Sequence, residues 1–337
     1  MNRTLYLLIA VVLLGGGAWW IVSAGQTPEK VGDRAVERQF GYADVDDLGR
    51  IFVADRAGHS VTLTRGGVTG WLADGKPANE NVLKNLLHAV QTIEVQSLPT
   101  QKAIPNMVQS LATSGILVQL YDRADRKVRG YYIGGSTNDE RGTFAIVEGS
   151  ENPYIVHLAG WTGNLRHRFN LWDDEWRDKV YFRADPDAVE LLSIDYPKQR
   201  NKSFRLERVG KNFRLSPIYE TGQPVREIPR GVAESILVRY ESFYVNRYEN
   251  QDEASITQAR DLLPFAVITL KQEDKDAQEM RIYPRFTGLT LGQDPKTGEM
   301  SQSNTLEAYT AFINGGEDWV LLNVETTQPL LVAYDSF

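Results

Sequence analysis

The stretch DVDDLGRIFVAD, residues 44–55, has a counterpart later in the chain, DPDAVELLSIDY, residues 185–196. The two stretches share aspartates at their first and third positions and apolar residues at matching later positions, at an offset of 141 residues. Apolar residues at every second position are typical of a β-strand with one face in a core. The pair therefore predicts the same strand at two places in the chain.

Further matches follow in the same order. The matching segments are SVTLTR (60–65) with SFRLER (203–208), GKPA (75–78) with GQPV (222–225), and ILVQL (116–120) with AVITL (266–270). Tyr132 and Ile133 are expected to correspond to Ile282 and Tyr283. The offset grows only where turn residues dominate, as insertions into surface loops would produce. Chance similarity between amphipathic strands is the alternative, and the ordered agreement favours two related units.

Each unit is expected to be an α+β fold. Its strands alternate apolar and polar residues, glycines break them into hairpins, and an amphipathic helix pattern follows, at residues 82–90 and again at 232–240. One helix for several strands predicts a mainly antiparallel sheet with the helix over one face. The predicted fold class is thus α+β, with one N-terminal transmembrane helix followed by two tandem related units of mainly antiparallel sheet, each with a covering helix.

The amino terminus carries 18 residues without a charge, LYLLIAVVLLGGGAWWIV at residues 5–22. As a helix this run would be about 27 Å long, close to the thickness of the hydrocarbon core of a bilayer. Arg3 precedes it, and Trp19 and Trp20 lie near its far end. The pattern predicts a single-pass anchor in the inner (cytoplasmic) membrane, with the body in the periplasm or otherwise outside the cytoplasm. A cleaved signal peptide is the alternative, because residues 22–24 are small enough for a cleavage site.

A chain of 337 residues exceeds the size at which a single core is the default. The expected segments are an anchor or signal peptide at 1–24, a tether at 25–39, a first α+β unit at 40–160, a Trp/Arg-rich linker at 161–184, and a second α+β unit at 185–337.

Composition and motif spacing exclude several function classes. A net charge of −7 and a pI near 5.3 argue against nucleic acid as a partner. The absence of cysteine excludes disulfides, thiolate metal sites and cysteine nucleophiles. The four histidines are scattered without metal-ligand spacing, so we expect no metal and no cofactor. We find no catalytic motif; paired carboxylates stay open, because the fold, not sequence spacing, sets such partners.

The glycine-rich stretch YYIGGSTNDERGT, residues 131–143, resembles a phosphate-binding loop only at first sight. It lacks the lysine of a P-loop and the spacing of a dinucleotide fingerprint, and the residues that follow it alternate like a strand. A connection between antiparallel strands is the first interpretation. A recognition loop is the alternative, with candidate residues Tyr131, Tyr132, Gly134, Gly135, Asn138, Asp139 and Arg141.

The linker is rich in tryptophan and arginine. Trp172 and Trp176 are four residues apart and would share one face of a helix. A strut that packs the seam between the units is the first interpretation, and a ligand or partner surface is the alternative, because exposed Trp and Arg are typical of interface hot spots. The candidate residues are Trp161, Arg166, Arg168, Trp172, Trp176 and Arg177.

The succession FGYADVDDLGRIFVADRAG, YYIGGSTNDERGT, YIVHLAGWTGNLRHRF, EWRDKVYF and IDYPKQRNKSFRLER resembles bacterial proteins grouped as domain of unknown function 4340, especially forms from the Bacteroidetes. The resemblance covers nearly the whole body and thins toward the carboxyl end. It implies an envelope location and a tie to ABC-type transport systems of the gliding-associated kind. It supplies no catalytic residue.

The predicted function is that of a non-enzymatic, membrane-anchored envelope protein, an accessory or scaffold subunit of a transport or surface-assembly system. The expected partners are the membrane, through residues 5–22, and transporter or envelope-assembly proteins. The alternative is a periplasmic binding module for a small molecule or glycan, with tryptophans lining its cleft, and a hydrolase is the less favoured third hypothesis.

Overall fold

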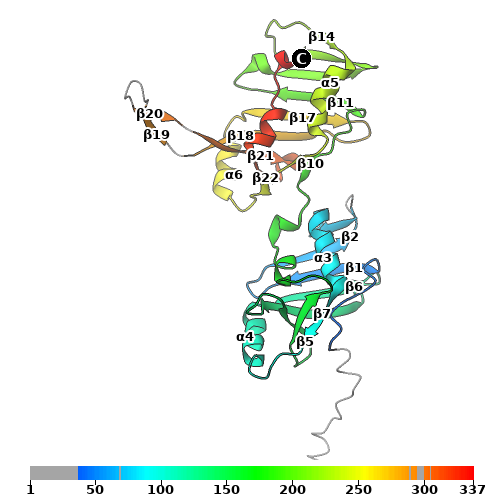
Figure 1. Ribbon diagram of the computed structural model, residues 1–337. Coiled ribbons are helices and arrows are strands. Elements are labelled where there is room, and N and C mark those ends of the chain that lie inside the picture. Colours follow the sequence, from blue (N-terminus) through cyan, green and yellow to red (C-terminus); the bar gives the residue numbers. More distant parts are fainter. Residues whose placement is uncertain (1–36, 68–69, 288–289, 294–299, 304) are drawn as a thin grey trace, which may run out of the picture. The chain divides into compact units, whose positions relative to one another are not determined.

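The structure is a computed structural model that describes residues 37–67, 70–287, 290–293, 300–303 and 305–337 (Figure 1). Contacts divide the chain into two compact units, Met1–Trp176 and Arg177–Phe337. Each unit is built on its own nine-stranded sheet, called sheet 1 and sheet 2 here. All strand pairs in both sheets are antiparallel.

Sheet 1 has the strand order β4-β3-β2-β1-β6-β7-β8-β9-β5. Its strands are β1 (Leu48–Ala54), β2 (Ser60–Arg65), β3 (Trp71–Ala73), β4 (Lys76–Pro77), β5 (Ile93–Ser97), β6 (Ile116–Asp122), β7 (Lys127–Ser136), β8 (Thr143–Val147) and β9 (Tyr154–Leu158). The described helices of this unit are α3 (Glu80–Thr92), α4 (Ile104–Ser114) and the short 3₁₀ helices η1 (Leu165–Arg168) and η2 (Asp173–Trp176).

Sheet 2 repeats this order as β14-β13-β12-β11-β17-β18-β21-β22-β16. Its strands are β11 (Val189–Asp195), β12 (Phe204–Val209), β13 (Asn212–Pro217), β14 (Arg226–Ile228), β16 (Arg247–Tyr248), β17 (Ala266–Gln272), β18 (Gln278–Phe286), β21 (Leu306–Ile313) and β22 (Asp318–Leu322). The α-helices are α5 (Arg230–Leu237), α6 (Glu253–Arg260) and α7 (Val324–Thr327). Two small ribbons, β10 (Val180–Phe182) with β15 (Phe243–Tyr244) and β19 (Thr290–Gln293) with β20 (Met300–Ser303), lie outside the main sheet.

Strand pairing fixes which residues of the two sheets are equivalent. Val53 pairs with Val118 in sheet 1, and Ile194 pairs with Ile268 in sheet 2, which preserves the offsets expected for these strands. The expected match of Tyr132 with Ile282 is wrong by one residue. Ile116 pairs with Ile133, and Ala266 pairs with Ile282, so Ile133 is the equivalent of Ile282 and Tyr132 that of Arg281. A shift of one residue exchanges the two faces of a strand.

One face of each sheet packs against an amphipathic helix and forms the main core. In α3, the side chain of Asn79 accepts hydrogen bonds from the first turn, which starts the helix. The residues of α3 that pack against sheet 1 are Leu83, Leu86, Ala89 and Val90, and those of α5 against sheet 2 are Ala233, Ile236 and Leu237.

A second helix covers part of the opposite face in each unit, which the sequence reading did not expect. In unit 1, Leu111 of α4 lies over Gly134 and Phe144, whose neighbours along the strands point into the main core. In unit 2, Ala259 of α6 packs in a separate cluster with Tyr283, Phe312 and Trp319. The main core and this smaller cluster therefore lie on opposite faces of sheet 2.

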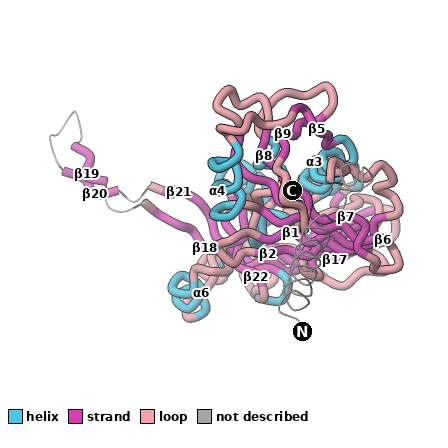
Figure 2. Tube along the Cα trace, turned by 90° about the horizontal axis from the view of Figure 1, so that it is seen from below, coloured by secondary structure: helices cyan, strands magenta, loops and turns pink. Residues whose placement is uncertain are grey.

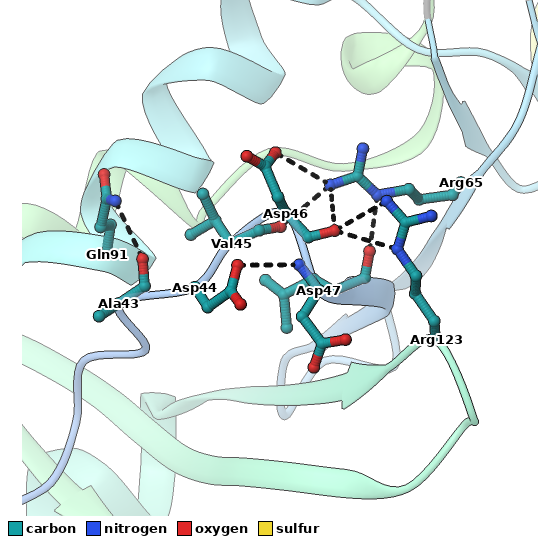
Figure 3. Close-up of polar contacts among 9 residues, drawn as sticks. Ala43, Asp44, Val45, Asp46, Asp47, Arg65, Gln91 and Arg123 are labelled. Carbon is teal, nitrogen blue, oxygen red and sulfur yellow. Dashed lines mark hydrogen bonds and ion pairs between the residues drawn. The ribbon is translucent and has the colours of Figure 1, made fainter.

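The segments that lead into the first strand of each sheet are held by an arginine in the same way, and Figure 3 shows the segment of unit 1. Arg65 donates from Nε to the carbonyl of Leu48 at 2.7 Å and from Nη2 to the carbonyl of Val45 at 3.0 Å. Arg208 repeats this in unit 2, with Nε at 2.8 Å from the carbonyl of Val189. Residues 44–47 form a loop that a second arginine also holds, since Arg123 donates to the carbonyl of Asp46.

The two units differ most in the hairpin that follows β7 or β18. Ile133 pairs with Ala145, twelve residues further on, whereas its equivalent Ile282 pairs with Ala311, twenty-nine residues further on. The additional residues include β19 and β20, drawn in Figures 1 and 2 as a ribbon that projects beyond the ends of β18 and β21. Unit 2 thus has an extended arm where unit 1 has a short turn.

The fold class and the location predicted from the amino terminus need correction. Among the described residues no helix is long and apolar enough to cross a membrane. The longest of these helices, α3, has 13 residues, about 20 Å against a hydrocarbon core of about 30 Å, and its polar side faces solvent. The structure therefore does not uphold the predicted transmembrane helix, nor the membrane and transmembrane assignments and the inner-membrane location that depend on it. Residues 5–22, on which the prediction was based, lie outside the described residues.

Candidate interaction surface

The paired glycines of YYIGGSTNDERGT make room for a helix. A Cβ atom added at Gly134 would lie 3.0 Å from Leu111 and 3.2 Å from Phe144, and one added at Gly135 would lie 3.3 Å from Ser110 Oγ. The Gly135 amide donates to that oxygen at 3.2 Å. In the structure the glycines let α4 approach β7 closely, and the stretch is a β7–β8 hairpin.

The other candidate residues of this stretch divide between core and turn. Tyr131 is fully buried against Phe40 and Phe169, and burial raises the pKa of its hydroxyl, which has no hydrogen-bond partner within the described residues. Asn138, Asp139 and Arg141 are exposed at the turn. Asp139 accepts hydrogen bonds from the Thr137 hydroxyl and the Arg141 amide, which lower its pKa. Tyr132 points to the opposite face of the sheet from Tyr131.

Residues of the expected linker contribute to the cores of both units. Leu165, Phe169 and Trp176 belong to the core of unit 1, and Tyr181 and Phe182 to that of unit 2. Within unit 1, η1 is fixed to the sheet, because Arg166 donates to the carbonyls of Ile133 at 3.3 Å and Gly134 at 3.4 Å. Burial lowers the pKa of this guanidinium.

The tryptophans of this segment have different environments. Trp176 is buried and donates from Nε1 to the carbonyl of Leu171 at 2.7 Å. Trp172 does not share a helix face with it; it stacks on His59 with ring centres 5.4 Å apart. Trp161 is partly buried beneath the Arg168 guanidinium, 5.1 Å from the ring centre.

The last candidate, Arg177, is a structural residue of unit 2. It is buried and donates to both carboxylate oxygens of Asp318, at 2.9 and 2.8 Å. Asn250 and Asn314 donate to the same carboxylate at 3.0 and 2.7 Å. Burial acts to raise the pKa of Asp318, but these donors outweigh it and lower the pKa to about 2. The guanidinium also lies 3.8 Å from the ring centre of Tyr248.

Neither of two pockets near charged residues has the features of a small-molecule site. The pocket beside Arg168, lined also by Val82, Asn85, His167 and Leu171, holds about 130 Å³, below the roughly 300–1,000 Å³ of typical ligand pockets. A pocket of about 490 Å³ in unit 2 is large enough, but its two arginines, Arg247 and Arg285, are both paired with Glu249.

The face of sheet 1 opposite the main core is open next to α4. Strand pairing places Ala54, Leu117, Tyr132 and Ile146 in one row across β1, β6, β7 and β8, called the apolar row here. All four are partly buried and none is charged. Phe52 lies in the next row on β1, across from Gln119.

Charged and polar groups border the apolar row. Arg56 is exposed and its guanidinium lies 5.2 Å from the ring centre of Tyr132. In the described part of the chain Arg56 forms no ion pair. Further along the strands Glu148 accepts hydrogen bonds from Gln119 at 3.0 Å and from Lys127 at 2.9 Å. Burial acts to raise the pKa of Glu148, but these donors lower it overall.

Sheet 2 carries different side chains at the equivalent positions. The equivalent row is Asp195, Val267, Arg281 and Phe312. Arg281 is exposed and forms an ion pair with Glu279, and α6 covers Phe312. The equivalent of Phe52 is Ser193. The row is thus entirely apolar in unit 1, whereas in unit 2 two of its four residues are charged and a third, Phe312, is covered by α6.

The sequence reading included Tyr132 among its candidates but missed the other three members of the apolar row and Phe52. These residues are far apart in the chain, and only the register of four strands brings them together. The available signal was the non-core phase of each alternating strand, where apolar residues occur in unit 1 and charged residues in unit 2.

Comparison with known proteins adds no relative. No protein-family model matches the chain, and searches against curated proteins and against solved structures found no match. The resemblance to the family of unknown function therefore stays a prediction. No group of three or more His, Cys, Asp or Glu that could hold a metal ion occurs among the described residues.

Proposed function

We propose that this protein is a non-enzymatic scaffold or accessory subunit that binds another protein through the open face of sheet 1. The observation that carries the proposal is the difference between the apolar row and its equivalent in sheet 2. Both units have the same strand order, so the topology does not require apolar residues on this face. Apolar side chains gathered on an accessible face favour binding, because burying them in a complex removes them from water.

The resemblance described above favours a transporter or surface-assembly protein as the partner. The alternative of a glycan-binding module has less support. Trp176 is buried in the core of unit 1, Trp172 is stacked on a histidine, and the pocket beside Arg168 is small.

The test is a comparison of two matched variants of the full-length, tagged protein, purified from the native cells under mild conditions. Leu117 and Val267 occupy equivalent positions on β6 and β17, and both are partly buried on the non-core face. We expect a specific partner to co-purify with the unchanged protein and with Val267→Ser, and to be lost with Leu117→Ser.

Thermal unfolding of both variants should first show that each remains folded. Recovery of the same proteins with all three forms would contradict the proposal, as would purification of the unchanged protein with no partner at all.

A further inference from the structure

The length of the apolar row matches that of a short helix. It crosses three spaces between neighbouring strands, from Ala54 on β1 to Ile146 on β8, which is about 15 Å at the usual strand separation. Together with the row that contains Phe52, it extends about 7 Å along the strands. A helix of about ten residues is 15 Å long and about 10 Å wide.

The same dimensions argue against a second copy of the sheet as the occupant. A stable protein pair buries about 800 Å² on each partner. The apolar row and the Phe52 row together cover at most roughly 100–150 Å² of sheet, and the Phe52 row continues through the polar Gln119. A face-to-face dimer would therefore have to bury the polar network around Glu148 and Lys127 as well.

Helix α4 already packs on this face, next to the apolar row. On β7, Tyr132 is two residues from Gly134, about 7 Å along the strand, and Gly134 lies under Leu111 of α4. Packed helices lie about 8–10 Å apart. A helix placed beside α4 at this distance would lie over Tyr132 and its neighbours in the apolar row.

We infer that a short amphipathic helix, supplied by the partner protein, docks on the apolar row beside α4. This inference rests on the proposed function and specifies the partner. The docked helix presents apolar residues at a spacing of three and four to Leu117 and Tyr132. It carries a carboxylate toward Arg56, the exposed cation beside Tyr132 that has no ion pair within the described residues.

The test is photo-crosslinking from the full-length protein in its native cells. A benzophenone amino acid replaces Leu117 or Tyr132 in unit 1, and Val267 or Arg281 at the equivalent positions of unit 2 as the matched controls. Mass spectrometry identifies the crosslinked peptides. We expect both unit 1 positions to crosslink to one partner segment, at residues three or four apart in a pattern with helical periodicity and acidic residues.

A synthetic peptide of the crosslinked segment then gives the affinity. Phe52→Ser and Tyr132→Arg introduce the residues that sheet 2 carries at the equivalent positions, and thermal unfolding should show that each variant remains folded. We expect each to weaken peptide binding to the intact protein about tenfold or more, since each removes a buried apolar contact. Arg56→Gln should weaken peptide binding less than these two changes do, and its effect should be larger at low salt than at high salt.

The outcomes separate the inference from the proposed function. Crosslinks to a second copy of the chain or to residues 1–36 of the same chain would overturn both. Crosslinks to a partner segment without helical periodicity would overturn only the helix and leave the scaffold function standing. Equal crosslinking from unit 1 and unit 2 would overturn the assignment of this face.

Discussion

Replacing Asp318 by asparagine tests the polar cluster that closes unit 2. The carboxylate accepts two hydrogen bonds from Arg177 and one each from Asn250 and Asn314, and it is 3% exposed. Asp318→Asn removes the carboxylate that accepts both hydrogen bonds from the buried Arg177 guanidinium, and it places an amide NH₂ against the donors of Asn250 and Asn314. Removing one partner of a buried ion pair costs about 3–5 kcal/mol, so we expect unit 2 to lose that much of its free energy of unfolding.

The pKa of Asp318 gives a second magnitude. It is about 2 in the folded protein against 3.8 in the unfolded chain. A difference of about 1.8 units corresponds to roughly 2 kcal/mol at 1.36 kcal/mol per unit. Because the pKa is lowered on folding, this contribution is fully present above pH 3.8 and is lost as the pH falls through about 2. Asp318→Asn should lack this part of the acid sensitivity.

Hydrogen exchange measured by mass spectrometry resolves the two units separately. Peptides from β21 and β22 should exchange about 10²–10⁴-fold faster in Asp318→Asn, while peptides of unit 1 should be unchanged. Glu279→Gln is the control, because it breaks an exposed ion pair with Arg281, which is worth about 0–1 kcal/mol. The reasoning would be refuted if Asp318→Asn and Glu279→Gln had equal effects, or if the variant and the unchanged protein lost stability equally between pH 4 and pH 2.

Three further predictions concern unit 1 and its equivalent in unit 2. Gly134→Val should destabilise unit 1 by about 1–3 kcal/mol in denaturant titration, because its side chain enters the space filled by α4; no loss would show that α4 packs elsewhere. The hydrogen bond to Asp55 raises the pKa of His59, and protonated His59 should quench the fluorescence of Trp172, on which it stacks. The fluorescence should therefore rise with pH at a midpoint above 6.5, and Trp172→Phe should abolish the change. The stability that the His59–Asp55 hydrogen bond adds is present below pH 6.5 and is lost as the pH rises through the folded pKa of His59. Arg65→Met and Arg208→Met should each cost about 1.5–3 kcal/mol, with faster hydrogen exchange confined to the unit that carries the change; exchange that rises in both units would contradict two separate clamps.

Local alternation in the sequence was sufficient to place the strands that begin each sheet. Ile51 and Val53 of β1, and Leu192 and Ile194 of β11, are core residues at the expected offset. The alignment of β7 with its equivalent strand β18, which decides which residues of the two strands correspond, was not predictable in the same way. A period of two has only two phases, and the glycines of unit 1 give no apolar side chain that would select one of them.

The second helix of each unit was missed because few of its residues are buried. In α4, Pro105 lies in the first turn and Met107 and Leu111 are the only buried residues. In α6, Ala259 is the only buried residue, so the strip facing the sheet is too narrow for periodicity to reveal. The apolar row was hidden for a different reason, since its members are set by tertiary register and not by neighbours in sequence.

The unequal residues at Gly134 and Tyr283 have a consequence for folding. A chain that contains two copies of one topology risks exchanging equivalent elements between the copies while both are incomplete. Tyr283 packs with Phe312 and Trp319 beneath α6, whereas the equivalent position beneath α4 is Gly134, which has no side chain. If α4 were placed on sheet 2 its Leu111 would meet the Tyr283 ring, and α6 on sheet 1 would leave a void. The volumes of these side chains therefore favour α4 on sheet 1 and α6 on sheet 2, and they make the exchanged arrangement less stable before either unit is complete.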